Sequence, residues 1–300
     1  MTGGWNSGTW VGGLAEWTEG DTAYLSVAFT WRLDDAYQRA VFLRSLGYQV
    51  RAGGPGVFTR KHYLAEVAEI GPRPGERFGE AVVRHNPMAT IASRGCPVGC
   101  WFCIVPKMEG KAFTELPDFP VRPVLCDNNL SALSSEYQDH IVSRYQAAGV
   151  PLLDANSGFE PRTFDDEVWN RWRGINRGPW RFAYDDQGDG PHVERVMQML
   201  KGVSARRKRV YVLIGNEPFD SCMDRIKRVI AWGGEPHAQP FIKLNALRRE
   251  PHVRHDWTPQ LLRDVARWVN RFGWKFADFK GYRRSARARD RYDEQQGMFL

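Results

Sequence analysis

The sequence lacks a long hydrophobic run. No stretch of its 300 residues approaches the roughly 18 uninterrupted apolar residues that a membrane-spanning helix needs. Residues 1–5 lack a charged segment followed by an apolar core, so we expect no secretory signal. These two absences predict a cytoplasmic protein with no membrane partner.

Cysteine is also scarce. The chain has five cysteines, and an odd number with three of them crowded into one short segment argues against a disulfide framework. Residues 1–95 contain no cysteine, so that part of the chain cannot hold an iron–sulfur cluster of its own. The apolar fraction of 42% and the aromatic fraction of 13% are ample for a buried core, which excludes disorder of the whole chain.

Basic residues outnumber acidic ones, with 42 Lys and Arg against 35 Asp and Glu, for a net charge of +7. The excess is clustered at Lys201 with residues 206–209, and in a tail that contains Arg283, Arg284, Arg287, Arg289 and Arg291. A basic surface favours an anionic partner, a nucleic acid above all. A solvated surface with an arginine-rich tail explains the same pattern without any partner.

The crowded cysteines are Cys96, Cys100 and Cys103, with the spacing C-x3-C-x2-C. Iron prefers thiolate ligands, and a four-iron cluster normally takes four cysteines. Cys126 and Cys222 lie outside this segment, so three local ligands would leave one iron open to another molecule. Zinc is the main chemical rival, but structural zinc usually uses paired C-x2-C units or a Cys/His set, and the first histidine after the segment is His140.

The segment resembles the cluster loop of the radical S-adenosylmethionine (SAM) superfamily. C-x3-C-x2-C carries an aromatic residue, Phe102, directly before the last cysteine, and residues 90–97 and 105–110 resemble the branch with methylthiotransferases and cobalamin-associated enzymes. The resemblance implies a 4Fe-4S cluster on the three cysteines, SAM on the open iron and an external electron donor of the flavodoxin or ferredoxin type. It also implies reductive cleavage of SAM to a 5′-deoxyadenosyl radical. Methylthio transfer is disfavoured because the N-terminal part has no cysteine.

The family's remaining SAM contacts map onto this sequence less closely. Where the family has a Gly-Gly-Glu segment, this chain reads Asp127, Asn128 and Asn129, so a variant segment would hold the SAM amino group. The tripeptide at residues 233–235 is interpreted as a turn. The other cofactor or substrate candidates implied by position are Asp154, Asn156, Ser157, Asp185, Gly215, Asn216, Glu217, Lys243 and Asn245, whereas Glu109 is as well explained by a pair with Lys107.

The order of elements predicts an α/β fold, namely a partial (β/α)6 TIM-like barrel with a small N-terminal βαβ unit. Strands are predicted at residues 89–93, 123–126, 150–154, 180–184, 209–214 and 239–244, and helices at 134–148, 165–172, 192–200, 220–232 and 259–271. Most of the strands are followed by Asp, Asn or Glu, at the edge where parallel α/β barrels hold their active sites. The expected domains are residues 1–86, a radical SAM core at 87–273 and a basic extension at 274–300.

The N-terminal region is expected to form a strand at 24–31, a helix at 34–46 and a strand at 48–52. This resembles a truncated cobalamin-binding domain. Cobalamin itself is not expected, because the Asp-x-His-x-x-Gly segment that supplies its lower ligand is absent. One βαβ unit is also too short for a complete doubly wound domain.

The substrate stays open at this point. Tryptophans and arginines alternate over residues 169–181, which suits base stacking but slightly favours a helix with its tryptophans inward and its arginines in water. A radical SAM enzyme acting on a nucleic acid base or nucleotide is one reading, with a peptide or small metabolite as alternative substrates. A nucleic-acid-binding or regulatory protein that keeps a cluster without cleaving SAM is the other, and the missing Gly-Gly-Glu segment favours it.

Overall fold

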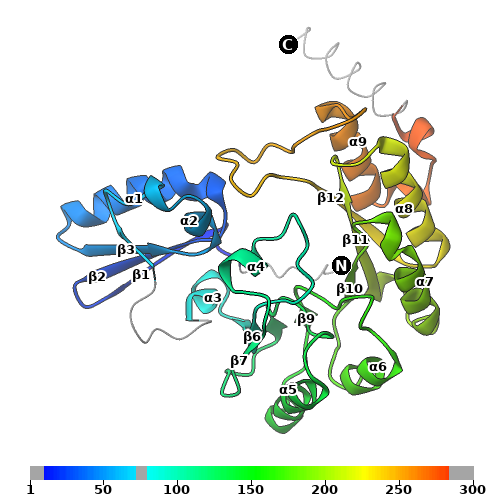
Figure 1. Cartoon of the computed structure of the whole chain (residues 1–300), viewed down its shortest axis with the longest axis horizontal. Coiled ribbons are helices and arrows are strands. Elements are labelled where there is room, and N and C mark those ends of the chain that lie inside the picture. Colours follow the sequence, from blue (N-terminus) through cyan, green and yellow to red (C-terminus); the bar gives the residue numbers. More distant parts are fainter. Residues whose placement is uncertain (1–9, 72–79, 284–300) are drawn as a thin grey trace, which may run out of the picture. The chain divides into compact units, whose positions relative to one another are not determined.

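The computed structural model describes residues 10–71 and 80–283, which form two compact units (Figure 1). The first unit contains the chain as far as Arg181 together with the segment Ile242–Glu250, and the second contains the intervening Phe182–Phe241 and the residues from Pro251 on. Arg284 and the tail arginines after it lie outside the described residues. The predicted boundaries at residues 87 and 274 stay predictions.

The first unit begins with a four-stranded sheet in the order β1-β2-β3-β4. β2 and β3 are joined by helix α1 and run parallel, so the predicted N-terminal βαβ unit is present. β1 pairs with β2 in an antiparallel hairpin, and β4 adds a fourth strand, neither of which was expected. The bounds are β1 Leu14–Glu19, β2 Thr22–Val27, η1 Thr30–Arg32, α1 Leu33–Ser45, β3 Gln49–Gly53, α2 Pro55–Thr59, η2 Lys61–Tyr63 and β4 Glu69–Ile70. Leu25, Leu33 and Leu64 lie at its core.

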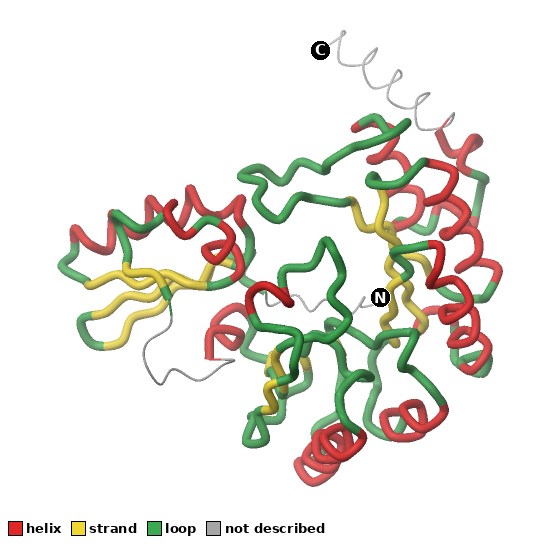
Figure 2. Tube along the Cα trace, in the orientation of Figure 1, coloured by secondary structure: helices red, strands yellow, loops and turns green. Residues whose placement is uncertain are grey.

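A second sheet of the first unit has the order β5-β8-β9, and its three strands are parallel. Its elements and their neighbours are α3 Glu80–His85, β5 Ala89–Thr90, β6 Ser93–Arg94, α4 Val105–Met108, β7 Thr114–Glu115, β8 Val124–Leu125, α5 Ser135–Ala148, β9 Asp154–Ala155 and α6 Asp166–Trp172. β6 and β7 pair as a separate antiparallel ladder. As Figure 2 shows, loops account for much of the chain between these short strands.

The helices of this sheet begin and end where their capping residues predict. The Ser134 hydroxyl accepts a hydrogen bond from Tyr137 N at the start of α5, and Gly149 ends the helix at a φ of 62°. Asp165 caps α6 in the same way through Val168 N. Trp172 and Trp180 are buried, as predicted for this run. The arginines are divided: Arg173 and Arg177 are exposed, as predicted, whereas the side chains of Arg171 and Arg181 are only 12% and 13% exposed and form ion pairs with Asp139 and Asp154.

The second unit contains the sheet β10-β11-β12, whose first strand crosses the boundary between the units. Its elements are β10 Trp180–Ala183, η3 Gln187–Asp189, α7 Gly190–Met199, η4 Ala205–Arg207, β11 Lys208–Ile214, α8 Phe219–Ala231, β12 Glu235–Pro240, α9 Pro259–Asn270 and η5 Gly273–Lys275. β11 and β12 are parallel, and Val210, Val212 and Ile214 are fully buried under α8. The last strand was expected at residues 239–244, which is four residues too late.

The fold is therefore mixed α/β with small parallel sheets, and the described residues form no closed barrel. None of the helices among the described residues combines the length and apolar character that a membrane crossing requires. Lys208 is only 4% exposed at the start of β11, so it does not contribute to the basic surface that was expected near residue 206.

Candidate metal centre

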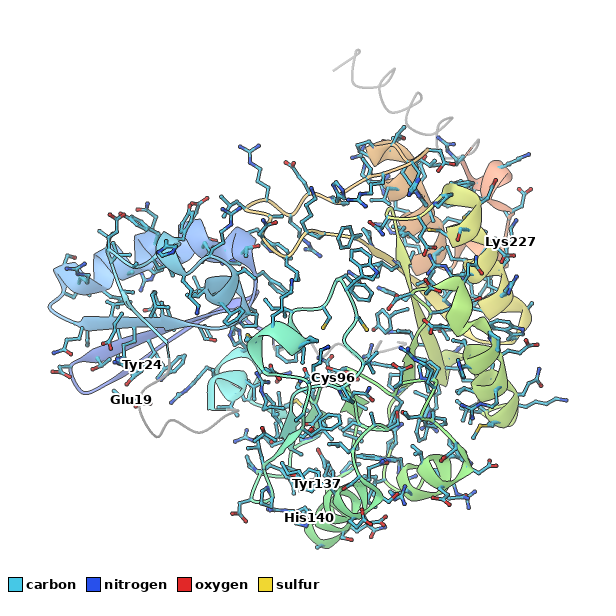
Figure 3. All side chains as sticks on the ribbon, viewed as in Figure 1. Glu19, Tyr24, Cys96, Tyr137, His140 and Lys227 are labelled. Carbon is cyan, nitrogen blue, oxygen red and sulfur yellow. The ribbon has the colours of Figure 1, made fainter. Side chains whose placement is uncertain are left out.

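Cys96, Cys100 and Cys103 lie on one loop that leaves β6 and returns through β7 (Figure 3, where Cys96 is labelled). None of the three cysteines forms a disulfide, and all three are partly exposed. The backbone of the loop is folded on itself, since Cys103 N donates to Cys100 O at 3.0 Å and Cys96 N donates to Gly110 O at 3.3 Å. The loop therefore presents its cysteines at the carboxyl side of β5, the first strand of the parallel sheet.

Gly95 allows the loop to turn sharply before the first cysteine. Its φ is 89°, and an added Cβ atom would lie 2.1 Å from Ala112 O. No other residue type fits a position with both a left-handed φ and backbone this close. Gly99, with a φ of 71°, gives the same freedom between the first two cysteines.

Glu109 joins the two ends of the loop, and we call its contacts the Glu109 clamp. Its carboxylate accepts hydrogen bonds from Gly95 N at 3.0 Å and from Asn128 Nδ2 at 2.6 Å, and it pairs with Arg94 at 2.5 Å. The Glu109 side chain is only 5% exposed. The alternative pair with Lys107 is therefore wrong, because the carboxylate is directed into the loop and is used there by Arg94.

The segment after β8 lies directly against this loop. Asn128 Nδ2 also donates to Gly95 O at 3.2 Å, and Asn129 Nδ2 lies 3.8 Å from Cys96 Sγ. Asp127 accepts hydrogen bonds from Ala92 N at 2.7 Å and from Ser93 Oγ at 2.5 Å. The structure thus places the segment that was expected to replace Gly-Gly-Glu against the start of the cysteine loop, at Gly95 and Cys96.

Burial raises the pKa of Asp127 to about 7, against the opposing effect of its hydrogen bonds from Ser93 and Ala92. The folded protein therefore keeps a proton on Asp127 that the unfolded chain releases near its ordinary pKa of 3.8. Between these two values the unfolded state binds fewer protons, so the stability conferred by this group falls as pH rises and levels off above pH 7.

We expect Asp127→Asn to remove this pH dependence, because the amide is uncharged at every pH. The free energy of unfolding of the wild type should lose up to about 1.4 kcal/mol per pH unit relative to the variant across this window. Urea unfolding of both proteins at intervals from pH 4 to pH 8 measures the difference. Parallel profiles for the two proteins would show that Asp127 titrates as an ordinary exposed carboxylate.

The thiols differ in their readiness to ionise. Burial raises the pKa of Cys103, and Val105 N donates to its Sγ at 3.4 Å, which favours the thiolate. Burial raises the pKa of Cys126 to about 12, with a further increase from Asp127 and Asp154. Cys222 is fully buried in the second unit. Cys126 is therefore a poor ligand, as its distance from the cysteine segment in the sequence also indicated.

The donor set fits an iron–sulfur cluster in its chemistry. Three cysteines share one loop, glycines let the backbone approach, and a buried clamp fixes the loop ends. Among residues 10–71 and 80–283, however, no three His, Cys, Asp or Glu side chains are grouped closely enough to hold a metal ion. Binding a cluster would therefore require the cysteine side chains to turn toward one another.

Other predicted residues of the first unit surround this sheet edge. Phe102 packs edge-on against Trp101, which is 62% exposed. Asp154 is held by Arg181 through two hydrogen bonds of 2.7 and 2.8 Å, which leaves it structural, while the side chain of Asn156 bonds to Cys126. Lys243 and Asn245 follow β12 in the sequence but belong to the segment Ile242–Glu250 of the first unit.

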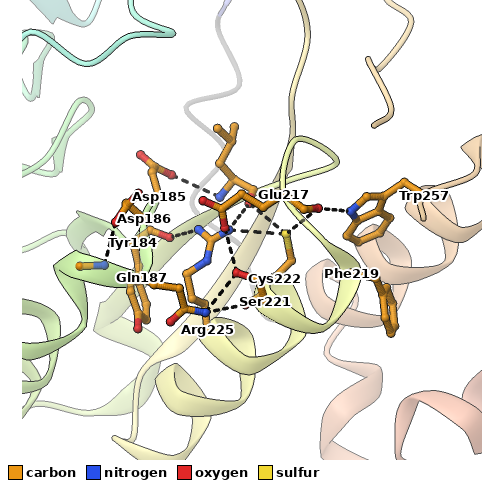
Figure 4. A network of polar contacts seen from close by, with 12 residues as sticks. Tyr184, Asp185, Asp186, Gln187, Glu217, Phe219, Ser221, Cys222, Arg225 and Trp257 are labelled. Carbon is orange, nitrogen blue, oxygen red and sulfur yellow. Dashed lines mark hydrogen bonds and ion pairs between the residues drawn. The ribbon is translucent and has the colours of Figure 1, made fainter. Parts of the chain in front are cut away.

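The candidates of the second unit gather around Arg225 (Figure 4). This fully buried guanidinium donates to Tyr184 O at 2.6 Å, to Leu213 O at 3.1 Å and to the Glu217 carboxylate at 2.8 Å. Asp185 accepts from Leu213 N at 3.2 Å, and Trp257 Nε1 donates to Glu217 O at 2.6 Å. Gly215 and Asn216 lie in the same turn after β11.

Sequence reasoning missed Arg94 and Arg225. Arg225 carried a usable signal, because it lies on the apolar face of α8 with Cys222, Ile226 and Val229. A buried charge in such a stripe predicts an ion-pair partner, and Glu217, whose side chain is 28% exposed, is that partner. Arg94 had no signal of its own, since its partner Glu109 is brought close only by the loop.

A scan against protein-family models finds no match for this chain, and a search of curated proteins also finds none.

Proposed function

We propose that this protein is a radical SAM enzyme. The observation that carries the proposal is the loop of Cys96, Cys100 and Cys103, which follows the first strand of a parallel sheet and lies against the segment after the second. Three thiols can hold three irons of a 4Fe-4S cluster and leave the fourth iron for SAM. When bound, a cluster would supply the one-electron reduction that cleaves SAM to methionine and a 5′-deoxyadenosyl radical, with the electron coming from a flavodoxin- or ferredoxin-like donor, and the radical would take hydrogen from the substrate.

The chain's own residues would then have three tasks at this loop. The Glu109 clamp fixes Arg94 and Gly95, so the first cysteine is held in place before any metal binds. Asn128 and Asn129 offer amide and carbonyl groups beside Cys96, where a bound amino acid would need polar partners. Phe102 and the exposed Trp101 offer flat apolar surface beside the last cysteine for an adenine ring.

We propose further that the sheets β5-β8-β9 and β10-β11-β12 are the two halves of a partial (β/α)6 barrel. Leu152, just before β9, pairs in parallel with Asn176 ahead of β10, and Phe159 N donates to Arg181 O at 2.9 Å, so pairing continues beyond β9. Asp185, Gly215, Asn216, Glu217 and Lys243 are then proposed to bind SAM or substrate. The proposed substrate is a nucleic acid base or nucleotide, in keeping with the basic composition; a peptide or small metabolite remains the alternative.

Anaerobic reconstitution with iron and sulfide tests the proposal. We expect about four irons per chain and, with SAM and a strong reductant, release of 5′-deoxyadenosine measured by liquid chromatography. The control is the protein reconstituted without reductant, which should release none. A fully loaded protein that releases none would instead favour a cluster-containing binding or regulatory protein, and preferential loading with zinc would contradict the cluster itself.

A further inference from the structure

The segment Ile242–Glu250, which we call the strap, is held by side chains of two connecting segments of the N-terminal region, η1 and the residue after α2. Thr30 Oγ1 donates to Leu244 O and to Ala246 O, and Arg60 donates to Asn245 O at 2.8 Å. These contacts all use carbonyl groups of the strap. Its own side chains are therefore free to face solvent, and most of them do, including those of Lys243, Arg248 and Arg249.

The strap carries an excess of positive charge. Its nine residues contain three cations and one carboxylate, Glu250, which lies 3.9 Å from Arg248 with both side chains highly exposed. An exposed ion pair of this length offsets little of the positive charge of the strap. Arg60 donates to the strap, and Lys61, the next residue in the sequence, is exposed. The positive charge therefore continues from the strap onto the residues that follow α2.

The strap also completes a stack of flat groups. The rings of Phe29 and Trp31 are stacked at 4.6 Å with an interplanar angle of 6°, and the Arg249 guanidinium lies 6.0 Å from the Trp31 ring. Phe29 is 45% exposed, although a ring of this size normally contributes to a core. A guanidinium over an aromatic ring offers a planar, cationic surface on which a nucleotide base can stack.

We infer that this surface, formed by the strap with Phe29, Trp31, Arg60 and Lys61, is a docking site for single-stranded nucleic acid. Cations at the strap would contact phosphates, and the Arg249 guanidinium, at one end of the stack, would contact an unpaired base. The strap also exposes Leu244 and Leu247, at 37% each, but its three cations against one carboxylate match an anionic partner better than a protein surface. The inference concerns binding alone and does not depend on the cluster or on SAM.

Fluorescence anisotropy of the full-length, metal-free protein with labelled oligonucleotides tests this inference. The probes are single-stranded DNA, single-stranded RNA and duplex DNA of the same sequence, each titrated at several salt concentrations. We expect a single strand to bind more tightly than the duplex, with affinity falling as salt rises. The two single-stranded probes distinguish DNA from RNA as the partner.

Two variants of the strap separate charge from stacking. Arg248→Ala combined with Arg249→Ala should weaken binding about tenfold or more and reduce the slope of log K against log salt by about 1.4, the value for two phosphate contacts on a single strand. Arg249→Lys keeps the charge, so it should keep the slope and still lose affinity several-fold. Both residues are exposed, so the fold should be unaffected.

The matched control is Arg173→Ala combined with Arg177→Ala, which removes two exposed arginines from the other basic and aromatic run of the chain. It should bind like the wild type. The inference is overturned if no single strand binds, if the duplex binds more tightly, or if the control loses as much affinity as the strap variant. Wild-type affinity of Arg249→Lys would overturn the stacking contact.

Discussion

Alanine at Cys96, Cys100 or Cys103 is expected to abolish iron incorporation, whereas Cys126→Ala is expected to load iron like the wild type. Each loop cysteine would supply one of three thiolate ligands, and a cluster held by two is not stably bound. The three loop cysteines are also partly exposed, so their replacement should leave the fold intact. The expected change is from about four irons per chain to less than one.

Cys126→Ala is the matched control because the substitution removes a thiol from the same sheet edge. Burial raises the pKa of Cys126 to about 12, so its thiolate, the form that binds metal, is costly to reach. Iron and sulfide assays on the reconstituted proteins, together with their visible absorbance, give the readout. Full iron loading by Cys100→Ala would show that the ligand set is wrong, and loss of iron in Cys126→Ala would move Cys126 into it.

Glu109→Ala is expected to destabilise the protein and to reduce iron loading at the same time. The variant leaves Arg94 without its carboxylate and Gly95 N without an acceptor, and Asn128 Nδ2 keeps only Gly95 O. The Glu109 side chain that is lost is only 5% exposed. Losing a nearly buried pair with its hydrogen bonds costs about 2–4 kcal/mol of unfolding free energy. The loop would also lose one of its contacts with the segment after β8, the hydrogen bond from Asn128 to Glu109.

Two companions make this result interpretable. Glu109→Gln keeps an acceptor for Gly95 N but loses the charge opposite Arg94, so its stability and iron loading should be intermediate. Glu115→Ala removes an exposed glutamate from β7 and should change the free energy of unfolding by no more than about 0.5 kcal/mol. Urea unfolding and iron assays measure both quantities. A Glu109→Ala protein with wild-type stability and full iron loading would show that the clamp does not hold the loop.

Local signals predicted the helices well. α5, α6 and α9 begin directly after their capping residues, Ser134, Asp165 and Thr258. The side-chain oxygen of each cap accepts a hydrogen bond from a backbone N–H of the first turn. β11 was equally clear, because its apolar and β-branched residues form one run. The cysteine spacing alone likewise identified the candidate centre, since all its ligands lie within one short segment.

Pairing between strands was less predictable. β12 begins at Glu235 and includes Pro236 and Pro240, which discourage a strand assignment. β12 tolerates these prolines because it is an edge strand of the described sheet and pairs only with β11. The register of that pair places Arg209 opposite Glu235. β1 was missed although Gly20, with a φ of 59°, marks the turn into β2.

The chemistry of the candidate centre and the helices around it follow from the order of amino acids, because capping, periodicity and cysteine spacing are properties of neighbouring residues. Three contacts follow only from the folded chain. Glu109 pairs with Arg94, Arg225 pairs with Glu217, and Arg60 donates a hydrogen bond to the strap. Each of these contacts depends on the path of a loop. Loop paths are set by the packing of the whole unit, which no local pattern encodes.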